Sequence, residues 1–153
     1  MIDVMSEQIN KLHAEYLKTR SAAVSLREFE YLLRIFPSLM ICMSDGKLDR
    51  EEWDGVLYMA DGLAEEFYDE NGIYKDKKDL ALTFRTEFRY LLENITKWEK
   101  RFINVLKDSI KDNRTAKEFV LETMYLFANV ADGISDSEQE AIDALAKRLN
   151  LTY

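Results

Sequence analysis

The chain has 153 residues, of which 47% are hydrophobic and 33% are charged, and its formal net charge is −8 at pH 7. This length and composition predict one domain with a sizeable hydrophobic core. The acidic balance argues against nucleic-acid binding, because neutralising phosphates requires clustered Lys and Arg. The single cysteine, Cys42, excludes an internal disulfide and a multi-cysteine zinc site, and we expect it to be buried.

The chain shows no signal for secretion or membrane insertion. It does not open with a basic stretch followed by an apolar one, and its longest dense apolar run, residues 35–43, is too short to span a bilayer. A single cysteine is also compatible with a reducing compartment. We therefore expect a cytoplasmic protein without direct membrane insertion.

Apolar residues at helical spacing predict that the first half of the chain is helical. They recur at steps of three and four over 2–17, and the lone His13 lies at the boundary of this apolar face. A second helix is predicted over 25–43, where Pro37 predicts a kink or a short break. The cleanest apolar stripe, over 53–67, predicts a third helix.

The second half continues this pattern after an expected exposed loop at 68–78. Apolar residues over 80–105 predict one long helix or two helices hinged near Asn94. We expect this stripe to face the centre of a bundle, and the alternative is a seam between copies of the chain. Further helices are predicted over 115–131 and from 135 to about 150. The predicted fold class is all-α, a single compact bundle of about seven helices.

One unit occurs twice in the chain: an apolar helix, a tight Asp-Gly turn and a second apolar helix. The turns lie at 45–46 and 132–133, where glycine supplies the positive φ that ends a helix and Asp braces the turn. The units, at about 25–67 and 115–151, predict an internal pseudo-twofold repeat within a single domain, 1–153.

Capping boxes mark the predicted starts of the helices on both sides of each turn. In this motif the first side chain accepts a hydrogen bond from an unpaired N–H of the new helix, and a Glu three residues later reaches back to the cap residue. The four boxes are Ser25 with Glu28, Asp49 with Glu52, Thr115 with Glu118, and Ser135 with Glu138.

The turns also carry carboxylates, which are hard oxygen ligands suited to Ca²⁺ or Mg²⁺. The first turn matches part of an EF-hand loop, but Ile41 and Met43 stand where that loop needs Asp, so it is not an EF-hand. A different arrangement remains open, in which the two turns meet and hold one cation or two adjacent ones. In the alternative, Asp only braces the turns and Glu only caps the helices. If the two turns meet around a cation, its ligands would be Asp45, Glu52, Asp132 and Glu138.

The two turns and their preceding helices form a pair of related motifs. These read Ser44-Asp45-Gly46-x-Leu48-Asp49-x-x-Glu52 and Ala131-Asp132-Gly133-Ile134-Ser135-x-x-Glu138. Together they resemble the TerB-like domain of tellurite-resistance proteins, over about 25–67 and 115–151. The second loop is one residue shorter, and Ser135 takes the place of the Asp49 carboxylate.

This resemblance implies a non-enzymatic protein with an acidic patch that binds a divalent cation, Ca²⁺ in preference to Mg²⁺. The implied metal ligands are Asp45, Glu52, Asp132 and Glu138, with Asp49 and Asp136 as second choices. Such proteins act in bacterial resistance to tellurite and related stress by associating with membrane-embedded Ter proteins. The resemblance therefore implies protein partners and a location at the inner membrane through a partner.

Two other functions remain open from the residues alone. A purely structural helical adaptor would use the turns without any metal. A carboxylate-metal hydrolase would use the bound ion to activate water. Direct capture of tellurite is disfavoured, because tellurite is an oxyanion and an acidic patch would repel it.

Overall fold

The computed structural model describes residues 4–20, 24–44, 49–71, 76–129 and 133–151. Within these ranges it contains seven α-helices and no strand, so the predicted all-α class is confirmed. The helices are α1 (Val4–Arg20), α2 (Leu26–Cys42), α3 (Arg50–Asn71), α4 (Lys77–Glu93), α5 (Ile95–Ile110), α6 (Arg114–Ala128) and α7 (Asp136–Arg148).

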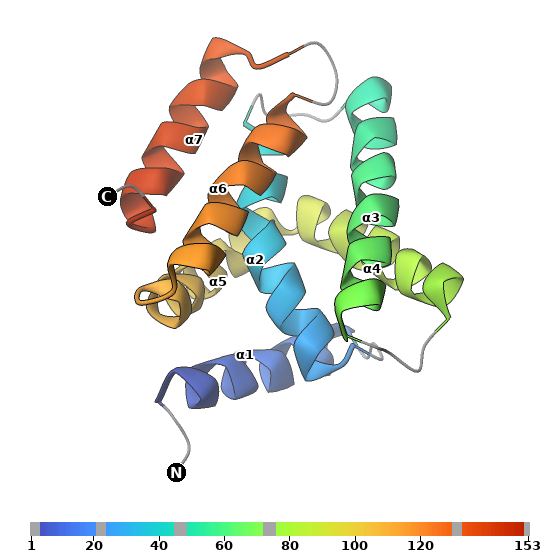
Figure 1. Ribbon diagram of the computed structural model, residues 1–153, viewed down its shortest axis with the longest axis vertical. Helices are drawn as coiled ribbons and strands as arrows, with labels where there is room; N and C mark the ends of the chain where they lie inside the picture. Colours follow the sequence, from blue (N-terminus) through green and yellow to red (C-terminus); the bar gives the residue numbers. More distant parts are fainter. Residues whose placement is uncertain (1–3, 21–23, 45–48, 72–75, 130–132, 152–153) are drawn as a thin grey trace.

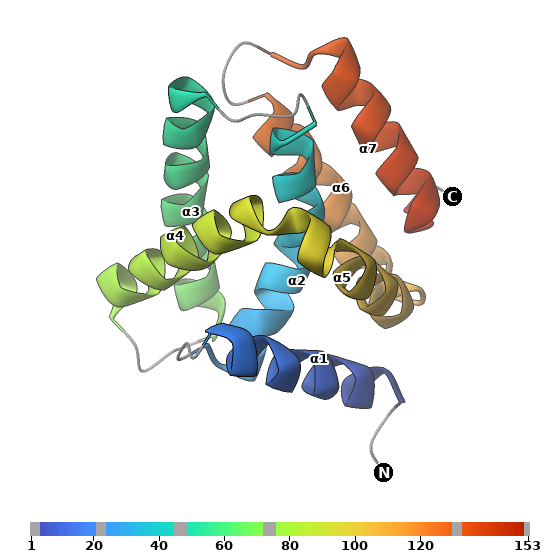
Figure 2. The same ribbon diagram turned by 180° about the vertical axis from the view of Figure 1, so that it is seen from behind.

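Helix α2 is the centre of the bundle. It packs most extensively on α6 and also contacts α1, α4, α5 and α7. Helices α4 and α5 cross behind it, and α1 lies across one end (Figures 1 and 2). Its sequence explains this place, because its C-terminal half is largely apolar on every side, and Ile35, Phe36 and Leu39 are fully buried there. A helical segment that is apolar all round has to be enclosed by other helices. The N-terminal half instead carries Arg27 and Arg34 on a more exposed face.

Pro37 lies inside this central helix and is buried there. The helix continues through it from Leu26 to Cys42, so the expected short break does not occur. Proline removes one backbone hydrogen bond, and the dense packing on both sides of α2 holds the helix together at that point.

The two repeated units are arranged alike in the bundle. Helices α2 and α6 lie side by side and run in the same direction, while α3 and α7 flank them and run back (Figure 1). Helix α3 contacts α6, and α7 contacts both α2 and α6.

Asn94 separates α4 from α5, which decides between the one-helix and two-helix alternatives. Its backbone leaves the helical region, at φ −133° and ψ 30°, and its side-chain Nδ2 donates to the carbonyl oxygen of Tyr90 at 2.8 Å. The apolar stripe on both helices faces the core, where Phe88, Phe102 and Leu106 are fully buried. The stripe is therefore part of this bundle and not a seam between copies.

The structure corrects two predicted helix ends. Helix α1 continues to Arg20, three residues past the expected end, and α3 continues to Asn71, so the expected loop at 68–78 begins later. Both extensions are polar turns, in which the apolar period fades although the backbone stays helical. Helix ends of this kind are not marked by hydrophobic spacing.

The predicted capping box of Thr115 with Glu118 is wrong. Helix α6 is capped by Asn113, whose Oδ1 accepts a hydrogen bond from the backbone N–H of Ala116 at 3.0 Å. Asn is at least as good an N-cap as Thr, and its position two residues earlier lets the helix gain an additional half turn. Glu118 instead accepts from Arg114 Nε at 3.3 Å on the helix surface.

Candidate cation site at the helix turns

The first turn joins α2 to α3. After α2, the backbone N–H of Met43 donates to the carbonyl oxygen of Met40, and that of Ser44 to the carbonyl oxygen of Ile41, each at 3.1 Å. Asp45 lies outside the described residues. The chain is described again at Asp49, whose Oδ1 accepts from the backbone N–H of Glu52 at 2.7 Å. The predicted role of Asp49 as a cap is therefore confirmed.

The second turn joins α6 to α7 and carries a complete capping box. Ser135 Oγ accepts from the backbone N–H of Glu138 at 3.1 Å, and Glu138 Oε1 accepts from the N–H of Ser135 at 2.9 Å. Gly133 has a φ of 83°, the left-handed conformation predicted for it. Asp132 lies outside the described residues.

The four described candidate ligands differ in their exposure. Asp49 and Asp136 are exposed at the starts of α3 and α7, whereas Glu52 and Glu138 are half-buried. One oxygen of Glu52, Oε2, is shielded from solvent. The Glu pair is therefore better placed than the Asp pair to hold an ion away from water.

Cys42, at the end of α2, lies within electrostatic range of one carboxylate from α3 and one from α7. Burial raises the pKa of its thiol to about 12, and the negative charges of Glu52 and Glu138 add to the shift. Coulomb interactions weaken with distance, so both carboxylates must lie near the same sulfur atom. Helices α3 and α7 accordingly begin at the end of the bundle where α2 ends (Figure 1). The carboxylates are 86 residues apart in the sequence, yet the fold brings them to one region.

The donors in this region fit a hard divalent cation. Ser44 Oγ is buried and has no hydrogen-bond partner in the described part of the chain. Carboxylate and hydroxyl oxygens are ligands that Ca²⁺ accepts, and a cation would offset the repulsion between two nearby carboxylates. Among the described ranges, however, no three His, Cys, Asp or Glu side chains form a group that could hold a metal ion. The described residues alone therefore do not form a metal site.

The thiol of Cys42 provides a first test of this geometry. We expect the folded protein to resist iodoacetamide at pH 8 and to show thiolate absorbance only as the pH approaches about 12. Since the folded-state pKa is raised from 9.0, the thiol favours the folded state below pH 9, and this contribution is lost between pH 9 and about 12. Replacing Glu52 and Glu138 together by Gln should lower the thiol pKa.

A matched control uses two exposed carboxylates on the same helices. Glu51→Gln and Glu140→Gln should leave the thiol titration unchanged, because neither charge contributes to the shift. Rapid alkylation at pH 8 would contradict the burial of Cys42, and a thiol pKa that does not respond to loss of the two Glu charges would contradict the approach of Glu52 and Glu138 to it.

Sequence reasoning missed a second cluster, on the far side of the core. Glu87 of α4 is 2% exposed and accepts hydrogen bonds from Tyr16 Oη at 2.6 Å and from Arg20 Nε and Nη2 at 3.0 and 2.9 Å. Arg20 also lies over the ring of Tyr90, 4.2 Å from its centre. These contacts fix α1 to α4. The available signal was a Glu on the apolar stripe, three residues after Phe84.

Comparison with known proteins does not assign the chain to a family. No helix in the described ranges is long and apolar enough to cross a membrane. No family model matches the chain, and no curated protein or solved structure is significantly similar to it.

Proposed function

We propose that this protein is a non-enzymatic, TerB-like module that binds a divalent cation at its two helix turns and acts through protein partners. The observation that carries the proposal is the approach of Glu52 and Glu138 to one thiol, that of Cys42. The parallel packing of α2 and α6 supports the same proposal, because the C-terminal ends of both helices lie at one end of the bundle.

Ca²⁺ is the cation that this donor set favours. It takes six to eight oxygen ligands in a flexible geometry, whereas Mg²⁺ requires a near-ideal octahedron. Loops of unequal length on two helix pairs are better suited to the flexible requirement. In this proposal Asp45, Glu52, Asp132 and Glu138 hold the ion with help from Ser44, and the exposed Asp49 and Asp136 contribute to the local negative charge.

When bound, the ion would supply positive charge that ties the first turns of α3 and α7 to the end of α2. Its effect would be structural, since it would stabilise one arrangement of the turns. We propose that this arrangement is what a partner recognises, as membrane-embedded Ter proteins would in the family that the turns resemble. Stress resistance, including resistance to tellurite, and a cytoplasmic location follow from that resemblance as part of the proposal.

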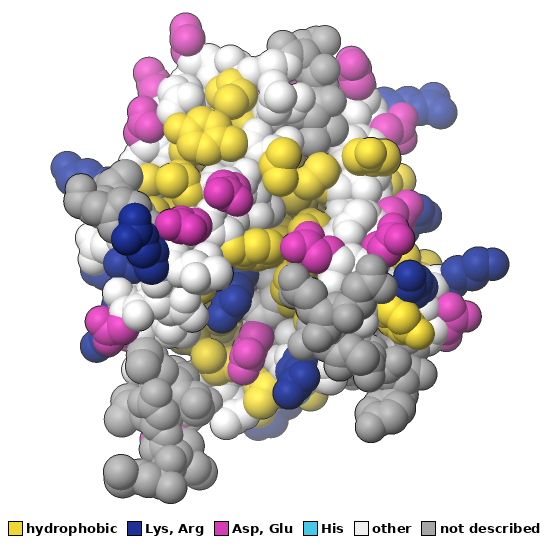
Figure 3. Space-filling model, viewed as in Figure 1, with side chains coloured by type: hydrophobic (Ala, Val, Ile, Leu, Met, Phe, Trp, Pro, Cys, Tyr) yellow, Lys and Arg dark blue, Asp and Glu magenta, His cyan; other side chains and the backbone are white. Residues whose placement is uncertain are grey.

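The surface offers features that a protein partner could use. Tyr58, Leu82, Leu126 and Ile134 are large hydrophobic side chains that remain exposed. On the face shown in Figure 3, hydrophobic side chains lie among Asp and Glu side chains. A partner segment with apolar and basic residues would complement such a surface.

The experiment that tests the cation site is a thermal melt of the metal-stripped full chain with and without Ca²⁺ or Mg²⁺. An ion at about 100 times its Kd adds about 2.7 kcal/mol to the free energy of unfolding. For a chain of this length we expect Tm to rise by about 5–10 °C with Ca²⁺ and by less with Mg²⁺. The Asp45→Asn, Asp132→Asn double variant and the Glu52→Gln, Glu138→Gln double variant should both lose the rise.

A control with the same loss of charge separates ligation from general electrostatics. The Asp54→Asn, Glu140→Gln double variant removes two exposed carboxylates from α3 and α7 and should keep the full Ca²⁺ response. If millimolar Ca²⁺ leaves Tm unchanged in the wild type, the structural adaptor replaces this proposal. Phosphoesterase activity that disappears in the Asp45→Asn variant would instead favour the metal hydrolase.

A further inference from the structure

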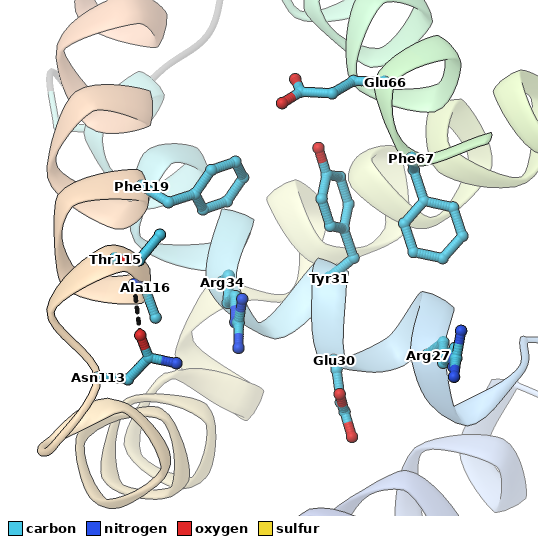
Figure 4. A pocket seen from close by; sticks show the side chains of 10 residues that line it. All are labelled: Arg27, Glu30, Tyr31, Arg34, Glu66, Phe67, Asn113, Thr115, Ala116 and Phe119. Atoms are coloured by element: carbon cyan, nitrogen blue, oxygen red, sulfur yellow. Dashed lines mark hydrogen bonds between the residues drawn. The ribbon is translucent and has the colours of Figure 1, made fainter. Parts of the chain in front are cut away.

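A cavity of about 360 Å³ lies between α2, α3 and the start of α6 (Figure 4). Cavities that hold small molecules have about this size or larger, and they combine apolar walls with a few polar groups. This one is separate from the helix turns and shares none of their carboxylates. Its lining therefore has to be explained independently of the cation site.

Aromatic rings form the centre of the cavity lining. Tyr31 of α2 lies between Phe119 of α6 and Phe67 of α3, with ring centres 5.6 and 5.0 Å away (Figure 4). Tyr31 and Phe119 are only half-buried, so part of this aromatic surface faces the cavity. The three rings offer an apolar surface on which an aromatic or aliphatic group could pack.

Opposite charges lie on opposite sides of these rings. Arg34 projects from α2 on the α6 side of Tyr31, whereas the Glu66 carboxylate lies on the α3 side, toward which the Tyr31 hydroxyl points (Figure 4). Arg34 and Glu66 make no hydrogen bond or ion pair within the described part of the chain, with each other or with any other residue. Arg34 is nevertheless half-buried, whereas Glu66 is exposed.

The surroundings of Arg34 strengthen its preference for an anion. Asn113 and Thr115, at the N-terminus of α6, line the cavity beside it. The partial positive charge at a helix N-terminus favours negative groups. Glu30, a second acidic residue of the lining, extends away from the rings (Figure 4). Arg27 adds a further positive charge on the same face of α2, two turns before Arg34.

We propose that this cavity binds a free α-amino acid with an apolar or aromatic side chain. Its carboxylate would pair with Arg34 beside the α6 N-terminus, its ammonium group would pair with Glu66, and its side chain would pack on Tyr31, Phe67 and Phe119. A zwitterion would pair with both charges. A simple anion would leave the exposed Glu66 to water, and a simple amine would leave the half-buried Arg34 without a partner.

The test is calorimetric titration of the full chain with four probes: L-phenylalanine, 3-phenylpropionate, phenethylamine and inorganic phosphate. Phenylpropionate lacks the ammonium group, and phenethylamine lacks the carboxylate. We expect L-phenylalanine to bind at least about tenfold more tightly than either analogue, which is the usual effect of losing one charged hydrogen-bonding group. Phosphate should not compete.

Variants test whether Arg34 binds the carboxylate of the ligand and Glu66 binds its ammonium group. Arg34→Gln and Glu66→Gln should each weaken L-phenylalanine binding at least about tenfold. Glu66→Gln should not weaken phenylpropionate binding, because that probe has no ammonium group. Arg34→Lys keeps the charge and should retain part of the affinity. The exposed controls Arg148→Gln and Glu65→Gln should change nothing, and unchanged thermal melts would show that each variant is folded.

The proposal would be overturned by the absence of L-phenylalanine binding at millimolar concentration, by equal affinity for phenylpropionate, or by binding that survives both charge variants. Phosphate binding that depends on Arg34 would point instead to a simple anion site and would also overturn it. None of these outcomes bears on the Ca²⁺ melt, because the cavity and the helix turns use different residues.

Discussion

Replacing Glu87 with alanine is expected to lower the free energy of unfolding by about 3 kcal/mol and Tm by about 10 °C. The Glu87 side chain is buried, and its two oxygens accept three hydrogen bonds from α1. Its removal leaves the Tyr16 hydroxyl and the Arg20 guanidinium without their acceptor. Buried groups that lose a charged partner carry the full cost of desolvation.

The size of this effect depends on how the partners are solvated. Arg20 keeps 22% of its side chain exposed, so water can replace part of what Glu87 supplied, which places the effect at the lower end for a buried ion pair. Tyr16 is fully buried, so water cannot replace the hydrogen bond that its hydroxyl would lose. Burial, followed by the Glu87 charge, raises the pKa of Tyr16, and the hydrogen bonds to Glu87 raise the pKa of Arg20. Both hydroxyl and guanidinium therefore remain protonated donors across the physiological range.

Urea denaturation of the full chain measures this prediction. Glu93→Ala serves as the control, because Glu93 is on the same helix and pairs with Arg89 at 3.3 Å but is 64% exposed. That variant should change the free energy of unfolding by less than about 0.5 kcal/mol. If Glu87→Ala were as mild as its control, α1 would be held by its apolar face alone.

The local helical architecture could be predicted from the sequence, because its causes are local. Apolar spacing predicts the helices, Asn94 marks the hinge between α4 and α5, and the box of Ser135 with Glu138 starts α7 as expected. The failures are also local in origin. Polar ends of α1 and α3 carry no hydrophobic signal, and the capping-box pattern favoured Thr115 although the cap of α6 is Asn113, two residues earlier.

The candidate sites depend on contacts between distant parts of the chain, and these could not be predicted in the same way. Glu87 accepts from residues 71 and 67 positions away. A Glu on an apolar stripe predicts a buried carboxylate, but nothing nearby in the sequence predicts its partners. The cavity also depends on distant contacts, since Arg34 and Glu66 line the same cavity only because α2, α3 and α6 pack together.

The candidate cation site could be predicted from the sequence in part. The carboxylates at the turns were predicted as candidates from the repeat, and their possible convergence was one of two open alternatives. Burial is the main cause of the raised pKa of the Cys42 thiol, and the additional contributions of the Glu52 and Glu138 charges favour convergence of these two side chains. The sequence could not exclude the alternative that these Glu residues only cap helices, because one side chain can have both roles. Glu138 closes a capping box, and its charge also contributes to the pKa shift of Cys42.

The aromatic cluster around Phe102 predicts the other large effect. Phe102 of α5 is fully buried, and its ring centre lies 4.8 Å from that of Phe36, 5.5 Å from that of Phe29 and 5.9 Å from that of Tyr16. It therefore joins α5 to both α1 and α2. We expect Phe102→Ala to lower the free energy of unfolding by about 4 kcal/mol, because the transfer energy of the ring is lost and a cavity remains.

Thermal and urea melts of Phe102→Ala measure this loss, with Leu82→Ala as the control for removal of a large side chain. Leu82 is 61% exposed on α4, and its replacement should cost less than about 0.5 kcal/mol. Since Tyr16 contacts Phe102 and also donates to Glu87, the Phe102 and Glu87 variants share a partner. Their effects should therefore combine to less than their sum, because either change alone already loosens α1. Strict additivity would show that the core and the buried ion pair hold α1 independently.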